Sequence, residues 1–185
     1  MKHRKIWFWV FLIILVGIFV LLNSPRLKQN DIINPSSVEN QKLSSREIVK
    51  VLRVVDGDTI KVLINDTQDT VRLIGIDAPE TVDPKKPVQC FGEEASAKAK
   101  EVLEDKEVVL ESDPTQGNRD EYGRLLRYVF LEDGTNFDGF MIFGGYAREY
   151  TFKGNPYKYQ MEFVQDQNKA KGENRGLWDS CQRSD

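Results

Sequence analysis

Residues 48–64 read IVKVLRVVDGDTIKVLI, two runs of β-branched residues separated by Asp56-Gly57-Asp58. Both runs are rich in Val and Ile and alternate in part between apolar and polar side chains, which favours β-strands. Asp-Gly is a common turn dipeptide between antiparallel strands. The segment therefore predicts a β-hairpin whose turn carries two carboxylates.

The chain around this hairpin continues with strands and one helix. A third strand is predicted over residues 69–76, and a Pro-rich loop follows to about Phe91. Residues 93–104 are rich in Ala and place their apolar side chains on one face, which predicts a helix. Two more strands are predicted over residues 107–111 and 122–131. Residues 48–131 are therefore expected to contain five strands and one helix.

Two further helices are predicted towards the C-terminus. Asn136 is a suitable N-cap for a helix over residues 137–144, which a pair of glycines ends. Asn155-Pro156 is expected to open a last helix that runs to about Lys171. Five strands and three helices in this order predict the fold class α+β, a closed five-stranded β-barrel of the OB-fold type with three flanking helices.

The N-terminus has the pattern of a membrane segment. Residues 6–22 are apolar or small and uncharged, and basic residues precede them. A helix of this length spans about 25 Å, and the basic flank predicts the N-terminus inside and the remainder outside. A cleavable signal peptide is the alternative, although residues 19–25 contain no good small-residue cleavage site.

These patterns divide the chain into three parts. Residues 1–23 are the predicted signal-anchor or transmembrane helix, the polar residues 24–47 a flexible linker, and residues 48–185 the folded domain. The expected location is the cell membrane, spanned once through residues 6–22, with the folded domain extracellular. Secretion after cleavage is the other possibility.

Charge and histidine content exclude several kinds of chemistry. The net charge is −3, but residues 1–47 carry +4 and the remainder −7, which argues against tight electrostatic binding of nucleic acid by the whole surface. The one histidine, His3, precedes the apolar run. Serine–histidine catalytic sites and His-ligated zinc sites are therefore not expected in the folded domain. Acid–base chemistry is left to carboxylates, Lys, Tyr or metal-bound water.

Residues 71–80, VRLIGIDAPE, combine charged groups with an apolar strand. In a continuous strand Arg72 would share a face with Ile74 and Ile76, where an unpaired guanidinium is costly. Arg72 is therefore either buried with a structural partner or placed to bind an anion. Pro79 disfavours helical geometry at the residue before it, which frees a carbonyl as a cation ligand and turns Glu80 back over the site.

Three other segments supply charges of the same kinds. Carboxylates at the Asp56-Gly57-Asp58 turn can direct oxygens at one hard cation. Residues 119–124, RDEYGR, offer a second arginine able to bind phosphate, with a solvated charged loop as the alternative. Residues 83–87, DPKKP, form a basic loop. Carboxylates, a carbonyl and two arginines together predict metal-assisted phosphoryl transfer.

With these motifs the chain resembles the staphylococcal nuclease (thermonuclease) family over about residues 48–178. Asp-Gly-Asp-Thr, Arg-Leu-x-x-x-Asp-x-Pro-Glu-Thr, Asp-x-Tyr-Gly-Arg and a late Leu-Trp occur in the family's order and at about its spacings. The resemblance implies an OB-type barrel with three helices. It also implies calcium-dependent hydrolysis of phosphodiester bonds in DNA and RNA that leaves 3′-phosphate ends.

The resemblance also assigns chemical roles within the site. Asp58, Asp77 and the carbonyl of Ala78 are the expected Ca²⁺ ligands, with Asp56 beside them. Glu80 is the expected base that activates water.

The resemblance further implies which groups contact the substrate. Arg72 and Arg124 are the expected catalytic arginines that bind the phosphate. Four residues are expected to contact nucleotides, although the alignment after residue 145 leaves open which tyrosine takes part: Lys85, Lys86, Tyr122 and Tyr150.

Two alternatives concern the cysteines and the activity. Cys90 and Cys181 suggest one disulfide in an exported chain, and two free thiols are the other possibility. An inactive OB-fold module that is tethered to the membrane and binds nucleic acid or protein is the alternative function. The presence of all five charged residues that the chemistry needs favours the enzyme: Asp58, Arg72, Asp77, Glu80 and Arg124. No protein partner is predicted.

Overall fold

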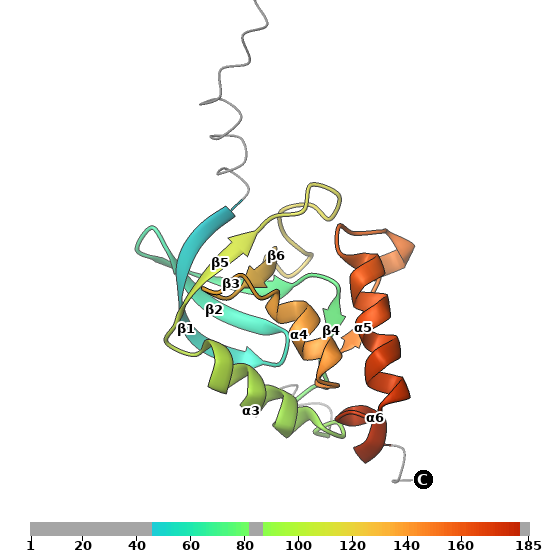
Figure 1. The fold of residues 1–185 in the computed structure, drawn as a ribbon. Helices are drawn as coiled ribbons and strands as arrows, with labels where there is room; N and C mark the ends of the chain where they lie inside the picture. Colours follow the sequence, from blue (N-terminus) through green and yellow to red (C-terminus); the bar gives the residue numbers. More distant parts are fainter. Residues whose placement is uncertain (1–45, 82–86, 182–185) are drawn as a thin grey trace, which may run out of the picture. The chain divides into compact units, whose positions relative to one another are not determined.

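The computed structural model describes residues 46–81 and 87–181, in which four strands precede the first helix and further strands and helices follow (Figure 1). The elements are β1 (Arg46–Asp56), β2 (Thr59–Ile64), β3 (Thr67–Leu73), β4 (Ile76–Asp77), α3 (Gly92–Leu103), β5 (Glu107–Glu111), β6 (Leu125–Phe130), α4 (Phe137–Phe143), β7 (Arg148–Glu149), η1 (Phe152–Gly154), α5 (Gln160–Gly172) and α6 (Leu177–Ser180).

Five strands close into a barrel in the order β1-β2-β3-β6-β5, as the sequence predicted. β1 and β2 form the predicted hairpin, which ends in the pair Asp56↔Thr59. β1 also pairs with β5, and register shifts between Val51 and Arg53 and between Val54 and Asp56 mark where this long strand departs from regular pairing. Such irregularities bend a strand and allow it to close a barrel.

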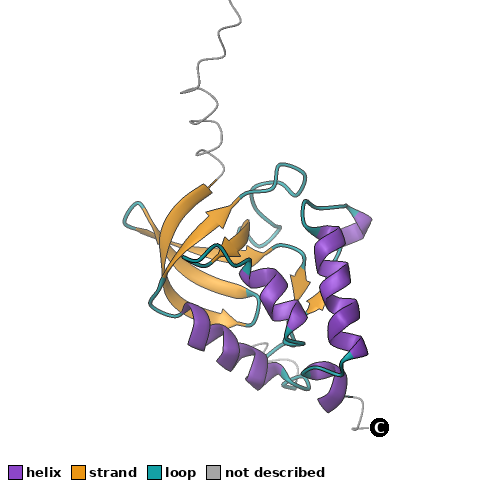
Figure 2. Ribbon diagram, in the orientation of Figure 1, coloured by secondary structure: helices purple, strands orange, loops and turns teal. Residues whose placement is uncertain are grey.

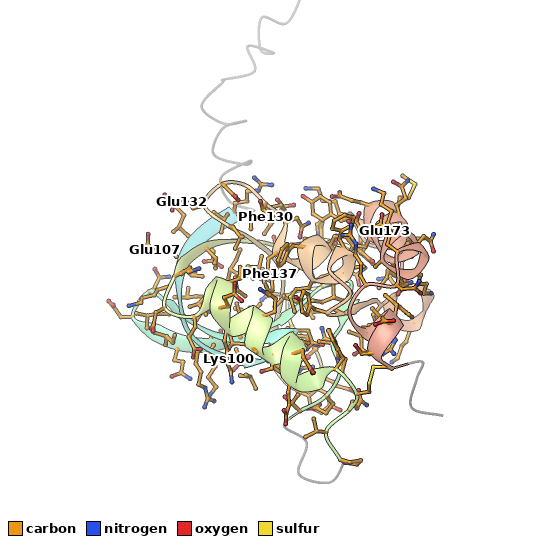
Figure 3. The ribbon with its side chains drawn as sticks, turned by 60° about the horizontal axis from the view of Figure 1, so that its bottom comes forward. Lys100, Glu107, Phe130, Glu132, Phe137 and Glu173 are labelled. Atoms are coloured by element: carbon orange, nitrogen blue, oxygen red, sulfur yellow. A yellow bond between two sulfur atoms is a disulfide. The ribbon has the colours of Figure 1, made fainter. Side chains whose placement is uncertain are left out.

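Helices pack against the outside of the barrel, and α5 (Gln160–Gly172) lies beyond α4 on one side of it (Figure 2). α3 packs against β1, while α4 packs against β6 and α5, and α5 also contacts β7. Asn136 caps α4 as expected, because its side chain accepts hydrogen bonds from the N–H groups of Asp138 and Gly139. Charged residues such as Lys100 and Glu107 lie on the outside (Figure 3). One core cluster of buried apolar residues links the barrel to the helices.

The third predicted strand is broken, which corrects the expectation for residues 69–76. β3 ends at Leu73, and Gly75 adopts φ +81°, a conformation that disfavours side chains. β4 then pairs with β7 in a separate two-stranded sheet. Arg72, Ile74 and Ile76 therefore do not share the face of one strand.

Two element starts were also predicted wrongly. β6 begins at Leu125 rather than at residue 122, because residues 119–124 form a turn. α5 begins at Gln160 rather than at Asn155-Pro156. The segment before α5 is held by tertiary hydrogen bonds instead: the Pro156 carbonyl accepts from Gln116, and the N–H of Lys158 donates to Asp113.

Cys90 and Cys181 form the predicted disulfide, which links the start of α3 to the end of α6. Within residues 46–81 and 87–181, none of the helices combines the length and apolarity needed to cross a bilayer. The segment that carries the membrane prediction, residues 6–22, lies outside the described residues.

Candidate active site

Asp58 lies at the turn of the β1–β2 hairpin and is almost fully buried. Its Oδ2 atom accepts a hydrogen bond from the Ala78 N–H at 2.8 Å, and its Oδ1 atom accepts one from the Thr59 hydroxyl at 3.0 Å. The Asp56 carboxylate accepts from the Asp58 N–H at 3.1 Å. The hairpin turn is thereby joined to the segment that follows β4.

Arg72, at the end of β3, links both parts of the site. Its Nη1 atom donates to the carbonyls of Leu73 and Ile76, at 2.8 Å each. Its Nη2 atom lies 3.1 Å from Asp58 Oδ2 and 3.5 Å from Asp77 Oδ1. The break at Gly75 makes this geometry possible, because it turns the Ile76 carbonyl and the Asp77 carboxylate back towards the guanidinium.

The carboxylates repel one another, which makes the site attractive to a cation. Burial, and then the charge of Asp58, raise the pKa of Asp56 to about 7. The same two causes raise the pKa of Asp77, partly offset by the positive charge of Arg72. A neighbouring negative charge that raises a carboxyl pKa is relieved when a cation binds.

The donor set fits a hard divalent cation. Asp58 and Asp77 contact the same guanidinium nitrogen, and both are oxygen ligands of the kind that Ca²⁺ prefers. Within the described part of the chain, no cluster of three or more His, Cys, Asp or Glu side chains is set to hold a metal. A cation here would therefore need backbone, water or substrate oxygens as well.

Glu80 follows the Ala78-Pro79 turn and is half-buried. Its backbone is fixed by Gln89, whose side chain accepts from the Glu80 N–H at 3.0 Å and whose N–H donates to the Glu80 carbonyl. Its negative charge also contributes to the raised pKa of Asp77. The backbone turn therefore brings the Glu80 carboxylate close enough to Asp77 for their charges to interact.

Arg124 is held by a turn of its own. Asp120 accepts hydrogen bonds from the Arg124 Nε atom at 2.7 Å and from the backbone N–H groups of Tyr122 and Arg124. Burial alone would raise the pKa of Asp120, but these hydrogen bonds and the Arg124 charge lower it. The Arg124 guanidinium also lies 5.4 Å from the centre of the Tyr122 ring. The side chain is thus oriented before any ligand binds.

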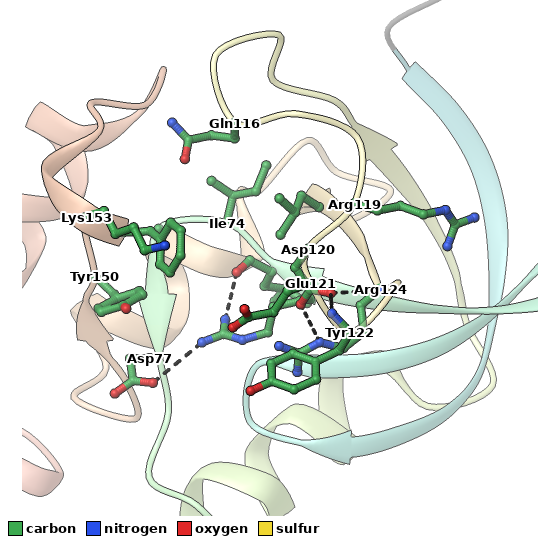
Figure 4. A pocket seen from close by; sticks show the side chains of 15 residues that line it. Ile74, Asp77, Gln116, Arg119, Asp120, Glu121, Tyr122, Arg124, Tyr150 and Lys153 are labelled. Carbon is green, nitrogen blue, oxygen red and sulfur yellow. Dashed lines mark hydrogen bonds and ion pairs between the residues drawn. The ribbon is translucent and has the colours of Figure 1, made fainter.

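A cavity of about 480 Å³ joins these parts (Figure 4). Arg72, Asp77, Tyr122 and Arg124 line it. Tyr150 lies on the other side, opposite Tyr122 and Arg124 (Figure 4). The structure therefore brings both predicted arginines, one predicted metal ligand and both predicted tyrosines to a single cavity.

Two predicted residues lie outside the described part of the chain, and two residues of the site were not predicted. Lys85 and Lys86, predicted to contact nucleotides, lie outside the described residues. No role was predicted from the sequence for Asp120, which orients Arg124, or for Arg148, which is the strand partner of Asp77 in the β4–β7 sheet. The role of Asp120 could have been predicted, because a carboxylate four residues before an arginine often pairs with it. The local sequence around Arg148 does not indicate that β7 pairs with β4.

Comparison with known proteins identifies the family. A family described as "Staphylococcal nuclease homologue" matches residues 70–180. The thermonuclease of Staphylococcus hyicus is 36% identical over 90% of this chain and 95% of its own length. Endonuclease YncB of Bacillus subtilis is 39% identical over 78% of this chain and 66% of its own length.

The SPbeta prophage-derived endonuclease YokF of Bacillus subtilis is 43% identical over 72% of this chain, but the match spans only 45% of YokF. The family and these names agree with the predicted enzyme class, a nuclease that hydrolyses phosphodiester bonds. The chain belongs to the staphylococcal nuclease family.

Proposed function

We propose that this chain is a calcium-dependent nuclease that cleaves DNA and RNA in the cavity between Arg72 and Arg124. The observation that carries the proposal is the position of Arg72, whose guanidinium contacts Asp58 and Asp77 while it lines a cavity shared with Arg124. Two guanidinium groups beside two carboxylates form a site that suits a phosphate together with a divalent cation.

The arginines bind the phosphodiester and stabilise the charge that develops on it. Arg72 is fixed by two backbone carbonyls and Arg124 by Asp120, so neither side chain must be ordered when substrate binds. Groups oriented in advance towards a developing charge give the largest single contribution to many enzymatic rate enhancements. Asp120 acts as a positioning residue for Arg124.

Asp58, Asp77 and the carbonyl of Ala78 would hold Ca²⁺, with Asp56 beside these ligands. When bound, the ion neutralises charge on the phosphate and polarises it. The raised pKa of Asp77, caused by burial and by Asp58, supports this assignment because it reflects negative charge that a cation would balance.

Glu80 is the proposed general base. It accepts a proton from a water molecule, and the resulting hydroxide attacks phosphorus. The bond from phosphorus to O5′ then breaks, the leaving O5′ takes up a proton from solvent to become a 5′-hydroxyl end, and a 3′-phosphate end remains. The interaction of the Glu80 charge with Asp77 and the backbone hydrogen bonds to Gln89 support the placement of this carboxylate at the site.

The place of action is proposed to be outside the cell, with residues 6–22 as a membrane anchor or a cleaved export signal. The apolar run with its basic flank supports export. The disulfide supports it independently, since such bonds persist in oxidising compartments.

Hydrolysis by the purified full-length chain in detergent tests this function. Plasmid DNA, single-stranded DNA and RNA should be cleaved in Ca²⁺, cleavage should stop when EGTA is added, and excess Ca²⁺ should restore it. Undiminished cleavage in EGTA would refute the dependence on calcium. Absence of cleavage in Ca²⁺ with a correctly folded protein would favour the inactive binding module.

A further inference from the structure

Gln89 holds the backbone of Glu80 with two hydrogen bonds. Its Oε1 atom accepts from the Glu80 N–H at 3.0 Å, and its own N–H donates to the Glu80 carbonyl at 2.9 Å. The Gln89 carbonyl in turn accepts from the Gly92 N–H, at the start of α3. The direction in which the Glu80 side chain leaves the backbone therefore depends on where Gln89 lies.

The start of α3 is in direct contact with the segment that carries Glu80. Gly92 is buried, and a Cβ atom built on it would lie 2.7 Å from Thr81 Cγ2 and 3.3 Å from the Glu80 carbonyl oxygen. Only a glycine allows two segments to approach this closely. A shift at the start of α3 would therefore also displace Glu80.

Non-covalent contacts hold Gln89 only weakly. Residues 87–90 are exposed, and the hydrogen bond between Gln89 and the Glu80 N–H is exposed as well. Such a hydrogen bond competes with water and contributes about 0.5–1.5 kcal/mol. Exposed segments with few buried contacts open locally while the remainder of a domain stays folded. Gln89 therefore needs a further attachment to keep Glu80 in one place.

The disulfide supplies that attachment. Cys90 directly follows Gln89 and is bonded to Cys181 at the end of α6. In contrast to residues 87–90, α6 is packed firmly: Leu177 is buried, and its N–H donates to the Gly145 carbonyl at 2.9 Å. The bridge thus fixes an exposed residue beside Gln89 to a helix that is anchored elsewhere in the fold.

We propose that the Cys90–Cys181 bridge positions Glu80 through Gln89, so that the nuclease reaches its full kcat only when the bridge is closed. This inference rests on the proposed function, because it takes Glu80 as the general base. A dithiol reductant opens the bridge by supplying two electrons and two protons. The products are the two cysteine thiols and the disulfide of the reductant.

Values of kcat and KM on single-stranded DNA in saturating Ca²⁺ test the proposal. The full-length chain in detergent is compared in the oxidised form, after reduction with dithiothreitol and as Cys90→Ser, with circular dichroism to show that each form is folded. Opening the bridge should lower kcat about 10- to 100-fold, as for a catalytic group misplaced by about 1 Å. KM should change less than about threefold, because Arg72 and Arg124 are held by other contacts. Ser180→Ala, beside the bridge, is the control and should keep kcat within about twofold of the oxidised chain.

A double-mutant cycle separates positioning of the base from a general loss of structure. In the Glu80→Gln chain, opening the bridge should lower the residual kcat less than about twofold, because the base that the bridge positions is already absent. An equal loss in both backgrounds would refute the proposal.

Gln89→Ala tests the same link with the bridge intact. It should lower kcat by about the same factor as Cys90→Ser, and Gln89→Glu, whose carboxylate can accept the same hydrogen bond, should restore most of the rate. If Gln89→Ala cleaves as fast as the oxidised parent, Gln89 does not position Glu80 and the proposal is wrong.

Hydrogen exchange gives a readout that does not depend on activity. With the bridge open, the N–H groups of Glu80 and Gln89 should exchange at least about 10-fold faster, because their segment opens locally. The Thr135 N–H, which is also exposed and donates to the Asp133 carboxylate at 2.9 Å, is the control and should exchange at an unchanged rate. Unchanged exchange at Glu80 would contradict the proposal. Faster exchange at Glu80 in a chain whose oxidised form does not cleave DNA would show that the bridge holds Glu80 but that the proposed function is wrong.

Discussion

At the scale of single residues, the site depends on side chains that the fold orients before substrate arrives. Arg72 shows this most clearly, because the Leu73 and Ile76 carbonyls fix one of its nitrogens while Asp58 and Asp77 contact the other. The sequence left open whether Arg72 has structural partners or binds an anion. The structure shows the partners, and the cavity beside the guanidinium leaves room for the anion as well.

Asp56 makes the metal-free protein sensitive to pH. Burial and the charge of Asp58 raise its pKa from 3.8 to about 7, so the folded chain holds this proton more tightly than the unfolded chain. The Asp56 contribution to the free energy of unfolding is therefore fully present below about pH 4. It falls by at most about 1.4 kcal/mol per pH unit as the pH rises towards 7.

Asp56→Asn should remove this contribution and flatten the stability profile between about pH 4 and 7. Urea unfolding in EGTA across that range measures it. If the profiles of the wild type and Asp56→Asn are parallel, the pKa of Asp56 is not raised in the folded chain.

At the scale of elements, the break between β3 and β4 positions the site. Gly75 permits the turn that separates the barrel from the β4–β7 sheet, and that turn aims Asp77 and the Ile76 carbonyl at Arg72. The Tyr157 hydroxyl also donates to the Gly75 carbonyl. The space beside this glycine is already filled by aromatic side chains.

Gly75→Ala should lower the free energy of unfolding by about 2–4 kcal/mol. A Cβ atom would lie 2.6 Å from the Tyr157 ring and 2.9 Å from Phe163, and alanine is strained at φ +81°. Gly134→Ala is the control, since Gly134 has φ +85° but nothing within 4 Å of a built Cβ. Urea unfolding compares the two, and equal losses would show that crowding at Gly75 contributes nothing.

Local patterns in the sequence predicted most helices and strands, but not the boundaries and contacts that depend on residues distant in sequence. The β1–β2 hairpin, α3 and α4 follow from alternation, an Ala-rich face and the Asn136 cap. The late start of α5 could not be predicted, because it depends on hydrogen bonds between residues 113–116 and 155–158, which are distant in sequence. Sequence motifs were enough to identify Arg72 and Asp77 as site residues. The pairing of Asp77 with Arg148 could not be predicted, because these residues are also distant in sequence and meet only in the fold.

At the scale of the whole molecule, the disulfide links the end of α6 to the segment before α3. Cys90 precedes α3 and Cys181 follows α6, at a sequence separation of 91. A cross-link over a loop of this size restricts the unfolded chain strongly, with an expected stabilisation of about 3–5 kcal/mol. The bridge therefore holds the end of α6 beside the segment that precedes α3.

Cys181→Ser should lower the free energy of unfolding by that amount. Urea unfolding followed by circular dichroism, with the oxidised wild type as reference and Ser180→Ala as a neighbouring control, measures the loss. A difference below about 1 kcal/mol between Cys181→Ser and the oxidised wild type would contradict a stabilising bridge.

We propose that phosphodiester bonds are cleaved in the cavity that Arg72 and Arg124 share. The most direct measurement is kcat on single-stranded DNA in saturating Ca²⁺ for the wild type, Arg124→Ala and Arg53→Ala, an exposed arginine of β1 outside the cavity. We predict a loss of about 10²–10³-fold for Arg124→Ala, as for removal of one group that stabilises transition-state charge. Arg53→Ala should stay within threefold of the wild type. Equal rates for the two folded variants would contradict the claim.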